Sequence, residues 1–147
     1  MTDCDETLLS IGAAAARAGV TERALRYYQE LGLLNPSGRT KGGMRRYSEA
    51  DLQRVARIRE LQTLLGLNLD EIAVVLGNED RTLQIRAAYF DEATDPTERK
   101  RLLLESLALA TDLRGTVEAK RAALDDFLTD LDARIERITT ALAEKFN

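Results

Sequence analysis

VTERALRYYQELGLLNPSGRTKGGMRRY, residues 20–47, is the stretch around which the rest of this 147-residue chain is organised. Its first part predicts a helix. Thr21 is a good N-cap, because its side-chain oxygen can accept a free backbone N–H of the first turn. Gly32 is expected to end the helix, and Pro36 prevents its continuation. Between these signals an apolar stripe recurs at the spacing of a buried helix face, and it consists of Leu25, Tyr28 and Leu31.

The second part of the stretch predicts a basic hairpin. The pair Gly42-Gly43 favours a tight two-residue turn, because glycine adopts positive φ without strain. The cations around this pair are Arg39, Lys41, Arg45 and Arg46. On the preceding helix, Arg23, Arg26 and Tyr27 fall off the apolar stripe and are expected to point outward. The stretch therefore predicts a helix with two exposed arginines, followed by a glycine-tipped loop that carries four cations.

Composition argues against several classes of protein. The chain contains no histidine, which removes the usual general base and the commonest metal ligand. We therefore expect no enzyme, no cofactor and no metal site. Cys4 is the single cysteine, so no internal disulfide can form, and we interpret it as a thiol without a role. No apolar run reaches the roughly 18 residues that span a bilayer. The acidic N-terminus lacks the features of a signal peptide, so we expect a cytoplasmic protein and no membrane partner.

The net charge of −4 hides a segregation of charge along the chain. Residues 10–60 contain 10 basic and 5 acidic side chains, whereas residues 61–147 contain 11 basic and 17 acidic ones. A basic first part beside an acidic second part suggests one face for a polyanion and another for a different partner.

Start and stop signals predict further helices on both sides of residues 20–47. Ser10 and Gly19 bound an alanine-rich helix, and two short helices joined by a tight glycine turn are typical of a helix-turn-helix. Ser48 with Asp51 resembles a capping box that opens a third helix, and Gly66 ends it. The apolar face of this third helix consists of Leu52, Val55, Ile58, Leu61 and Leu65, and its outward arginines are Arg54, Arg57 and Arg59. Asn68 and Gly77 are expected to bound a fourth helix.

Residues 9–76 closely resemble the winged helix-turn-helix domain of the MerR family of bacterial transcription regulators. The matching segments are SIGAAAARAGVTERALRYYQELGLLNP, GRTKGGMRRYSEADLQRVARI and LGLNLDEIAVVL. The sequence departs from the family pattern at Met44, where a tyrosine is usual, and at Leu67-Asn68, where Phe-Ser is common. The resemblance implies an all-α fold, mainly α with a small β wing, in which a long antiparallel coiled-coil dimerisation helix follows the winged domain.

The C-terminal part predicts that dimerisation helix. Asp95-Pro96 is a strong helix start, from which the pattern can run to the end with one weak point at Gly115. Apolar residues then recur in a heptad pattern, as in a coiled-coil seam: Val117, Leu124, Leu128, Leu131, Ile135, Ile138 and Leu142. Arg121 interrupts the seam. A homodimer is favoured over a helix folded back on residues 80–110. The resemblance implies antiparallel pairing of two such helices.

These signals divide the chain into three predicted parts. Residues 8–77 form the DNA-binding domain, residues 78–112 a helical connecting region, and residues 113–145 the dimerisation helix. In the connecting region Tyr89, Phe90 and the leucines of residues 102–109 either line a small apolar pocket for an effector or belong to the core. Core packing is the favoured interpretation, and no effector is assigned.

The predicted DNA contacts lie on the second helix, the wing and the third helix. A recognition helix lies in the major groove, where an arginine can donate two hydrogen bonds to guanine. Wing cations suit phosphate contacts. Each arginine can instead be a solvated surface charge, and Thr21 and Tyr27 can be only a cap and a packing ring. The full set of candidates is Thr21, Arg23, Arg26, Tyr27, Arg39, Lys41, Arg45, Arg46, Arg54 and Arg57.

The resemblance implies a homodimer that binds and distorts promoter DNA so that RNA polymerase can use it. A second hypothesis is an architectural DNA-bending protein that binds repeats without an effector. A third is a protein-binding coiled-coil adaptor, which the basic character of residues 10–60 disfavours.

Overall fold

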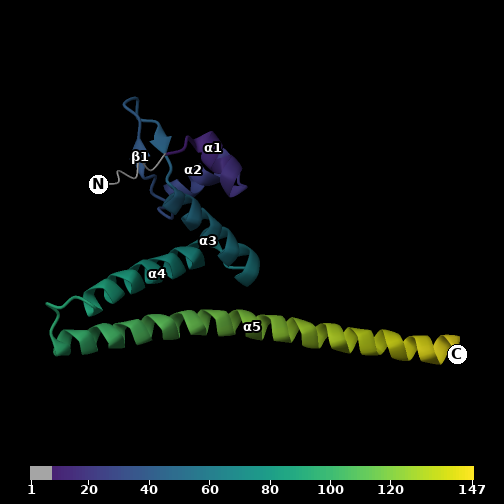
Figure 1. The fold of residues 1–147 in the computed structure, drawn as a ribbon. Coiled ribbons are helices and arrows are strands. Elements are labelled where there is room, and N and C mark those ends of the chain that lie inside the picture. The colour runs from purple at the N-terminus through teal and green to yellow at the C-terminus, as the bar shows by residue number, and fades with distance from the viewer. Residues whose placement is uncertain (1–7) are drawn as a thin grey trace. The chain divides into compact units, whose positions relative to one another are not determined.

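The computed structural model describes residues 8–147, and it is helical apart from one small hairpin and short connections (Figure 1). Its contacts divide the chain into two compact units, Met1–Asp80 and Arg81–Asn147. The elements in chain order are α1 (Ile11–Ala18), α2 (Glu22–Glu30), β1 (Gly38–Arg39), β2 (Arg45–Arg46), α3 (Glu49–Leu65), α4 (Leu69–Tyr89) and α5 (Pro96–Phe146). The predicted fold class, mainly α with a small β wing and a long C-terminal helix, is confirmed.

The helix-turn-helix consists of α1 and α2, and its predicted caps are confirmed. The Ser10 side chain accepts a hydrogen bond from the Ala13 backbone N–H at 3.3 Å, and Thr21 accepts one from Ala24 at 3.0 Å. Gly19 ends α1 at φ 68°, a left-handed conformation that glycine adopts most easily. The two helices are therefore bounded by local chemistry, and the turn between them is fixed by a single glycine.

The core of the first unit is formed by apolar residues of all four helices and of the segment after α2. Leu25 and Tyr28 are buried as predicted, but Leu31 is 42% exposed. Leu31 is the C-cap of α2, and the chain then turns at Gly32, so the helical spacing no longer governs the next residues. Leu33 and Leu34, which follow the turn, are buried, with exposed fractions of 3% and 1%.

The wing is an antiparallel pair in which Gly38 lies opposite Arg46 and Arg39 opposite Arg45. The prediction of a two-residue turn is wrong. The Thr40 backbone N–H donates to the Met44 carbonyl at 2.8 Å, and this pair leaves Lys41, Gly42 and Gly43 in the loop. Of the two loop glycines only Gly43 has positive φ, at 82°. A three-residue hairpin loop needs one left-handed residue at its end, so one glycine suffices.

The helix α3 begins with the predicted capping box of Ser48 and Asp51, and Gly66 ends it at φ 61°. The helix α4 begins with the predicted cap, since the Glu71 backbone N–H donates to the Asn68 side chain at 2.8 Å. The predicted end of this helix at Gly77 is wrong, because α4 continues to Tyr89. Gly77 is not among the glycines with positive φ, so it takes helical geometry and the helix passes through it.

The second unit pairs the end of α4 with the start of α5. Asp95 is the N-cap of α5, with Pro96 in its first turn, as predicted. Ile85 of α4 and Leu102 of α5 are buried, and Arg81 forms a bidentate ion pair with Glu105. This hydrogen bonding lowers the pKa of the Glu105 carboxyl below its usual value. The helix α5 is continuous for 51 residues, so Gly115 does not interrupt it. Within residues 8–147, no helix combines the length and apolar character of a membrane-spanning segment.

Candidate nucleic-acid interface

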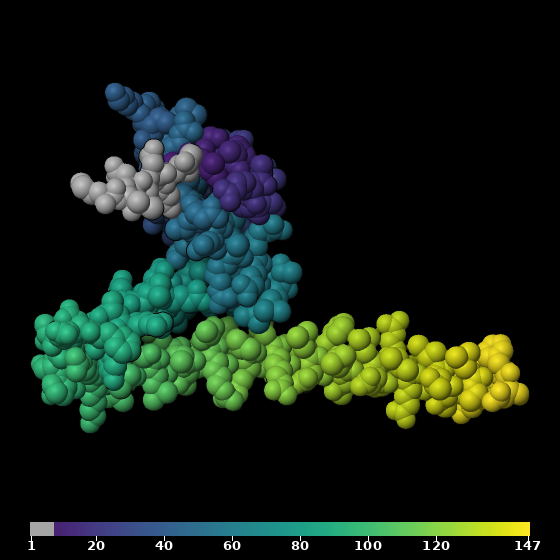
Figure 2. All heavy atoms as spheres, viewed as in Figure 1, coloured from purple at the N-terminus to yellow at the C-terminus, as the bar shows by residue number. Residues whose placement is uncertain are grey.

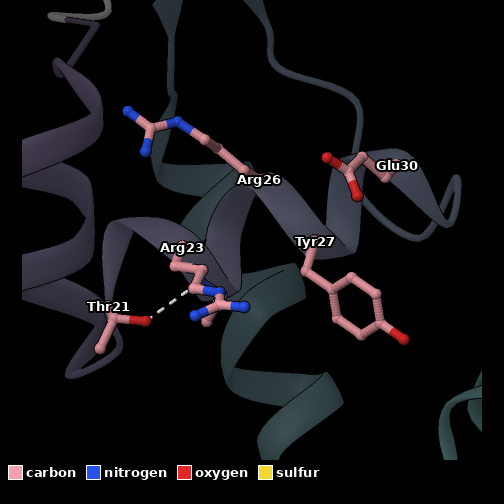
Figure 3. A pocket seen from close by; sticks show the side chains of 6 residues that line it. Thr21, Arg23, Arg26, Tyr27 and Glu30 are labelled. Carbon is pink, nitrogen blue, oxygen red and sulfur yellow. Dashed lines mark hydrogen bonds between the residues drawn. The ribbon is translucent and has the colours of Figure 1, made fainter.

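The outward face of α2 forms a shallow, open hollow, and six side chains line it. Figure 3 shows Arg23, Arg26 and Tyr27 extending from the helix into solvent, while Thr21 caps its first turn. Tyr27 is 49% exposed, so its ring is accessible to a ligand. The lining residues are Thr21, Arg23, Ala24, Arg26, Tyr27 and Glu30. The face is therefore polar, exposed and held in place by a helix that is packed on its other side.

The two arginines of this face are available for a ligand. Arg26 lies 3.5 Å from Glu22 of the same helix, and about half of each side chain is exposed, 55% for Arg26 and 48% for Glu22. An exposed pair of this kind contributes little stability, so it opens readily to a stronger partner. Arg23 forms no ion pair with any of the residues 8–147. Both guanidinium groups keep donors free for planar acceptors such as a base edge or a phosphate.

The wing brings like charges together. Arg39 and Arg45 lie directly opposite each other in the hairpin register, so their side chains are on the same face of the ribbon. Lys41 is exposed in the loop, and Arg46 is partly exposed next to Arg45. Figure 2 shows the wing projecting from the rest of the first unit. Like charges placed opposite each other on a hairpin are destabilising, and a bound polyanion would remove that cost.

The segments before β1 and after β2, which are the two legs of the wing, are both anchored to α3 through Asp51. Its carboxylate accepts hydrogen bonds from the Ser37 backbone at 3.0 Å, the Ser37 hydroxyl at 2.7 Å and the Ser48 backbone at 2.8 Å. The Ser37 and Ser48 hydroxyls are also 2.7 Å apart. The capping box predicted the contact with Ser48, but no sequence signal identified Ser37 as a partner.

A second anchor of the wing is Tyr47, which is buried at the end of β2. Its hydroxyl accepts a hydrogen bond from the Gln29 side chain of α2, and its backbone pairs with Leu9. The wing and α2 are thus connected through one buried aromatic residue.

The arginines of α3 have partners inside the first unit. Arg54 donates to the Leu33 carbonyl at 2.7 Å and to Asp80 at 2.8 Å, whereas Arg57 donates to Glu79 at 3.0 Å. The hydrogen bond with Glu79 raises the pKa of the Arg57 guanidinium. The structure therefore gives both residues a structural contact to α4, and their predicted contact with DNA stays a prediction.

Arg59 is the third outward arginine of α3, and it holds the turn of the helix-turn-helix. It donates to the Ala18 carbonyl at 3.3 Å and to the Gly19 carbonyl at 2.9 Å. A cation that caps the end of α1 also satisfies two of its free carbonyl groups.

The predicted seam residues all lie on α5, on one stripe of the helix. Leu131 is partly exposed and the other six are exposed, with fractions from 37% for Val117 to 66% for Leu124. A row of exposed leucines and isoleucines on a long helix is the pattern expected of an unpaired coiled-coil strand.

The remaining candidates have different outcomes. Core packing, the favoured interpretation for the connecting region, is confirmed for Leu102, which is buried, but it is wrong for Phe90, which is 71% exposed and packs edge-on against Tyr89 with ring centroids 5.2 Å apart. It is also wrong for Leu103, Leu104 and Leu107, which are 54%, 58% and 64% exposed. Cys4 lies outside the described residues. Among residues 8–147, no group of three or more acidic, cysteine or histidine side chains is arranged to hold a metal ion.

Comparison with known proteins identifies the family. A family model described as "MerR HTH family regulatory protein" matches residues 9–79. The chain is 34% identical over 97 residues to the HTH-type transcriptional regulator YfmP of Bacillus subtilis, covering 66% of this chain and 69% of YfmP. It is 36% identical over 137 residues to the HTH-type transcriptional activator TipA of Streptomyces coelicolor, covering 93% of this chain but 46% of TipA.

Solved structures show the same fold. The crystal structure of HiNmlR, a MerR family regulator lacking the sensor domain and bound to promoter DNA, has a TM-score of 0.56. It is 24% identical, and the alignment covers 93% of this chain and 94% of HiNmlR. With the helix-turn-helix, the wing and the long C-terminal helix in place, the chain belongs to the MerR family of helix-turn-helix regulatory proteins.

Proposed function

We propose that the chain is a sequence-specific DNA-binding transcription regulator that acts as a homodimer. In this proposal α2 enters the major groove, where Arg23 and Arg26 read base edges and Thr21 and Tyr27 make neighbouring contacts. The wing cations Arg39, Lys41, Arg45 and Arg46 bind phosphates, and Arg54 and Arg57 add backbone contacts. Phosphate contacts position the protein, whereas base contacts specify the sequence.

One observation carries this proposal most strongly. Arg39 and Arg45 face each other across the hairpin, in a segment where Lys41 and Arg46 add further positive charge. A protein that gained nothing from this arrangement would be more stable without it. A phosphate backbone supplies closely spaced negative charges, so it converts the repulsion into binding energy.

Dimerisation accounts for the exposed stripe on α5. In the proposed division, residues 8–77 contact DNA, residues 78–112 connect, and residues 113–145 pair with a second copy. A two-fold dimer presents two recognition helices to an inverted repeat, with half-sites about one helical turn apart. The stripe is otherwise an exposed apolar surface without a function.

Regulation at a promoter is the next part of the proposal. We propose that the dimer works in the cytoplasm and distorts promoter DNA, so that RNA polymerase can engage its two contact elements. Sequence-dependent DNA stiffness then shares in the specificity. The names of YfmP, TipA and HiNmlR, which are a regulator, an activator and a regulator bound to promoter DNA, support this proposal by similarity.

Substitution of Arg26 tests the proposal that α2 contacts DNA bases. Arg26→Ala should weaken specific binding by about 1–3 kcal/mol and relax one base preference, because a bidentate base contact is lost. Binding is measured by fluorescence anisotropy on a selected operator and on single-base variants of it. Arg137→Ala, an exposed arginine on α5, is the matched control and should bind as the unsubstituted protein does. If Arg26→Ala leaves both the affinity and the base preference unchanged, the proposal that Arg26 of α2 contacts bases in the major groove is wrong.

Chromatin immunoprecipitation separates promoter regulation from the architectural alternative. A promoter regulator predicts a small number of inverted repeats placed between promoter elements. An architectural DNA-bending protein predicts many direct repeats with no fixed relation to promoters, and that outcome would replace the proposed function.

A further inference from the structure

The apolar stripe of α5 extends further toward its N-terminus than the seam at residues 117–142. Leu103 and Leu107 occupy the heptad positions that precede the seam, and they are 54% and 64% exposed. Leu102, their neighbour on another face of the helix, is buried. The exposed apolar stripe of α5 thus begins at Leu103 and ends at Leu142. Its length is about 60 Å at roughly 1.5 Å per residue.

Two arginines interrupt this longer stripe at positions where a coiled coil normally has an apolar residue. Arg114 lies 2.9 Å from Glu118 and Arg121 lies 3.9 Å from Asp125, each one turn away on the same helix. Both guanidinium groups are strongly exposed, at 75% and 83% of the side chain. Ion pairs at such exposure contribute little, so these arginines need another explanation if the stripe is an interface.

In the proposed homodimer two α5 helices pair antiparallel, as the resemblance to the MerR family implies. We propose that the two-fold axis of this pairing passes between Ala122 and Ala123. The inference rests on the proposed homodimer and specifies its register. In this register every position of the stripe from Leu103 to Leu142 has a partner. The apolar layers place Leu103, Leu107, Ala110 and Val117 opposite the partner's Leu142, the partner's Ile138, the partner's Ile135 and the partner's Leu128, respectively.

The same register supplies both arginines with a carboxylate. Arg121 lies opposite the partner's Leu124 and beside the partner's Asp125. Arg114 lies opposite the partner's Leu131 and beside the partner's Asp132. In an antiparallel pair these arginines and aspartates are on the same side of the interface, so the two-fold axis generates four ion pairs. Charged residues that flank a coiled-coil core set orientation and register, which is the role we assign to Arg114 and Arg121.

Neighbouring registers are less favourable. Moving the axis to Asp126 places Leu107 opposite the partner's Lys145 and puts Arg114 beside the partner's Thr139 instead of a carboxylate. Moving the axis to Ala119 keeps carboxylates beside both arginines. That register, however, puts Ile138 opposite the partner's Lys100 and Val117 opposite the partner's Arg121. Burying apolar surface is the main driving force of association, so the apolar layers decide for the axis between Ala122 and Ala123.

Charge reversal in two separate chains tests the register. In an Arg121→Asp homodimer, carboxylates face each other at both Arg121 sites, and in an Asp125→Arg homodimer guanidinium groups do. A mixture of the two variants restores both pairs, although neither chain regains the pair within its own helix. The heterodimer should dissociate at least about tenfold less readily than either homodimer, because close charges of like sign disfavour wrong partners. Native mass spectrometry of an equimolar mixture measures it.

The outcomes of the mixing experiment are distinct. A heterodimer fraction well above the statistical half supports the register, and a statistical fraction overturns it. The register with its axis at Ala119 predicts no heterodimer preference, since Arg121 would then face the partner's Glu118, which neither variant changes. Arg137→Asp, on the outward face of α5, is the control and should mix statistically with the unsubstituted chain.

A distance measurement gives an independent test that needs no change in the interface. A spin label on Thr140→Cys, in a Cys4→Ser background, should show an intersubunit distance of about 50 Å by double electron–electron resonance. Each neighbouring register changes this distance by about 10 Å. A DNA-binding dimer with another distance would refute the register but leave the proposed function intact. A monomer that still binds its operator would refute the dimer on which both depend.

Discussion

Asp51 accepts three hydrogen bonds from the two legs of the wing, although it belongs to α3 and carries no charge that DNA would attract. It is 8% exposed, and its carboxylate is the common partner of Ser37 and Ser48. The position of the basic hairpin thus depends on one buried acid. At the residue scale, the groups that bind a ligand and the groups that position them are different, and the second kind is the more buried.

Removing the Asp51 carboxylate should destabilise the first unit. Asp51→Ala leaves two backbone N–H groups without their acceptor, so we expect a loss of about 2–3 kcal/mol in the free energy of unfolding. Ser37→Ala removes one hydroxyl and should cost about 1 kcal/mol. Urea unfolding monitored by circular dichroism measures both. Equal losses for the two variants would mean that the carboxylate does not act as the common anchor.

Residue-scale features were predictable from sequence where they are local. Ser10, Thr21, Ser48 and Asp95 were predicted as N-caps and act as such, because a cap depends on residues within one helical turn. The partners of Arg54 and Arg57 were not predictable in this way. Asp80 and Glu79 lie more than 20 positions away in the sequence, and only the packing of α3 against α4 brings them together.

The wing turn shows how one element depends on a single backbone conformation. Gly43→Ala should strain the hairpin by about 1–2 kcal/mol, because a side chain disfavours the left-handed region. Nothing lies within 4 Å of the added Cβ, so the effect is conformational and not a clash. Gly42→Ala is the matched control, since Gly42 has no positive φ and should change little. Operator affinity and thermal unfolding measure both variants, and equal effects at the two positions would contradict the observed turn.

At the same scale, the length of α4 was mispredicted for a physical reason. Gly77 is a stop signal only when the chain takes a left-handed turn there, and nothing in the local sequence forces that turn. Asn78 to Tyr89 continue as helix, and Glu79 and Asp80 are held by arginines of α3. Tertiary contacts therefore decided a boundary that local propensity left open.

For the whole molecule, the salt dependence of operator binding should report the wing. Each phosphate contact releases counterions, so the logarithm of affinity falls linearly with the logarithm of salt concentration. Lys41→Ala should weaken binding to all sequences similarly and reduce the slope by about 1. Anisotropy titrations at several salt concentrations measure the slope. A slope that does not change would show that Lys41 makes no phosphate contact.

Dimerisation is the other property of the whole molecule. Ile138→Asp places a charge in the α5 stripe, opposite the partner's Leu107 in the proposed register, and should dissociate the dimer at micromolar concentration, because a buried unpaired charge is costly. Ala133→Asp introduces the same charge outside the stripe and should leave the dimer intact. Analytical ultracentrifugation distinguishes the two. A dimer that persists in Ile138→Asp would mean that the α5 stripe is not the interface.

The sequence predicted the seam from Val117 onward but not its extension to Leu103 and Leu107. Arg114 and Arg121 interrupt the heptad pattern, so the two leucines looked unrelated to it. Their exposure on a continuous α5 is what connects them to the stripe. The interruption became interpretable only when the helix was known to be unbroken through Gly115.

The continuity of α4 and α5 also bears on how this protein can be cut. Proteases act on chain that can be pulled into an extended form, and helices resist this. Between Leu69 and Phe146 the helices are interrupted at residues 90–95. Limited digestion with a glutamate-specific protease should thus begin at Glu92, not near Gly77. Such a cut would leave α5 attached to α4 only through noncovalent contacts such as the ion pair of Arg81 with Glu105, so one cleavage would weaken the attachment of α5 without unfolding the first unit.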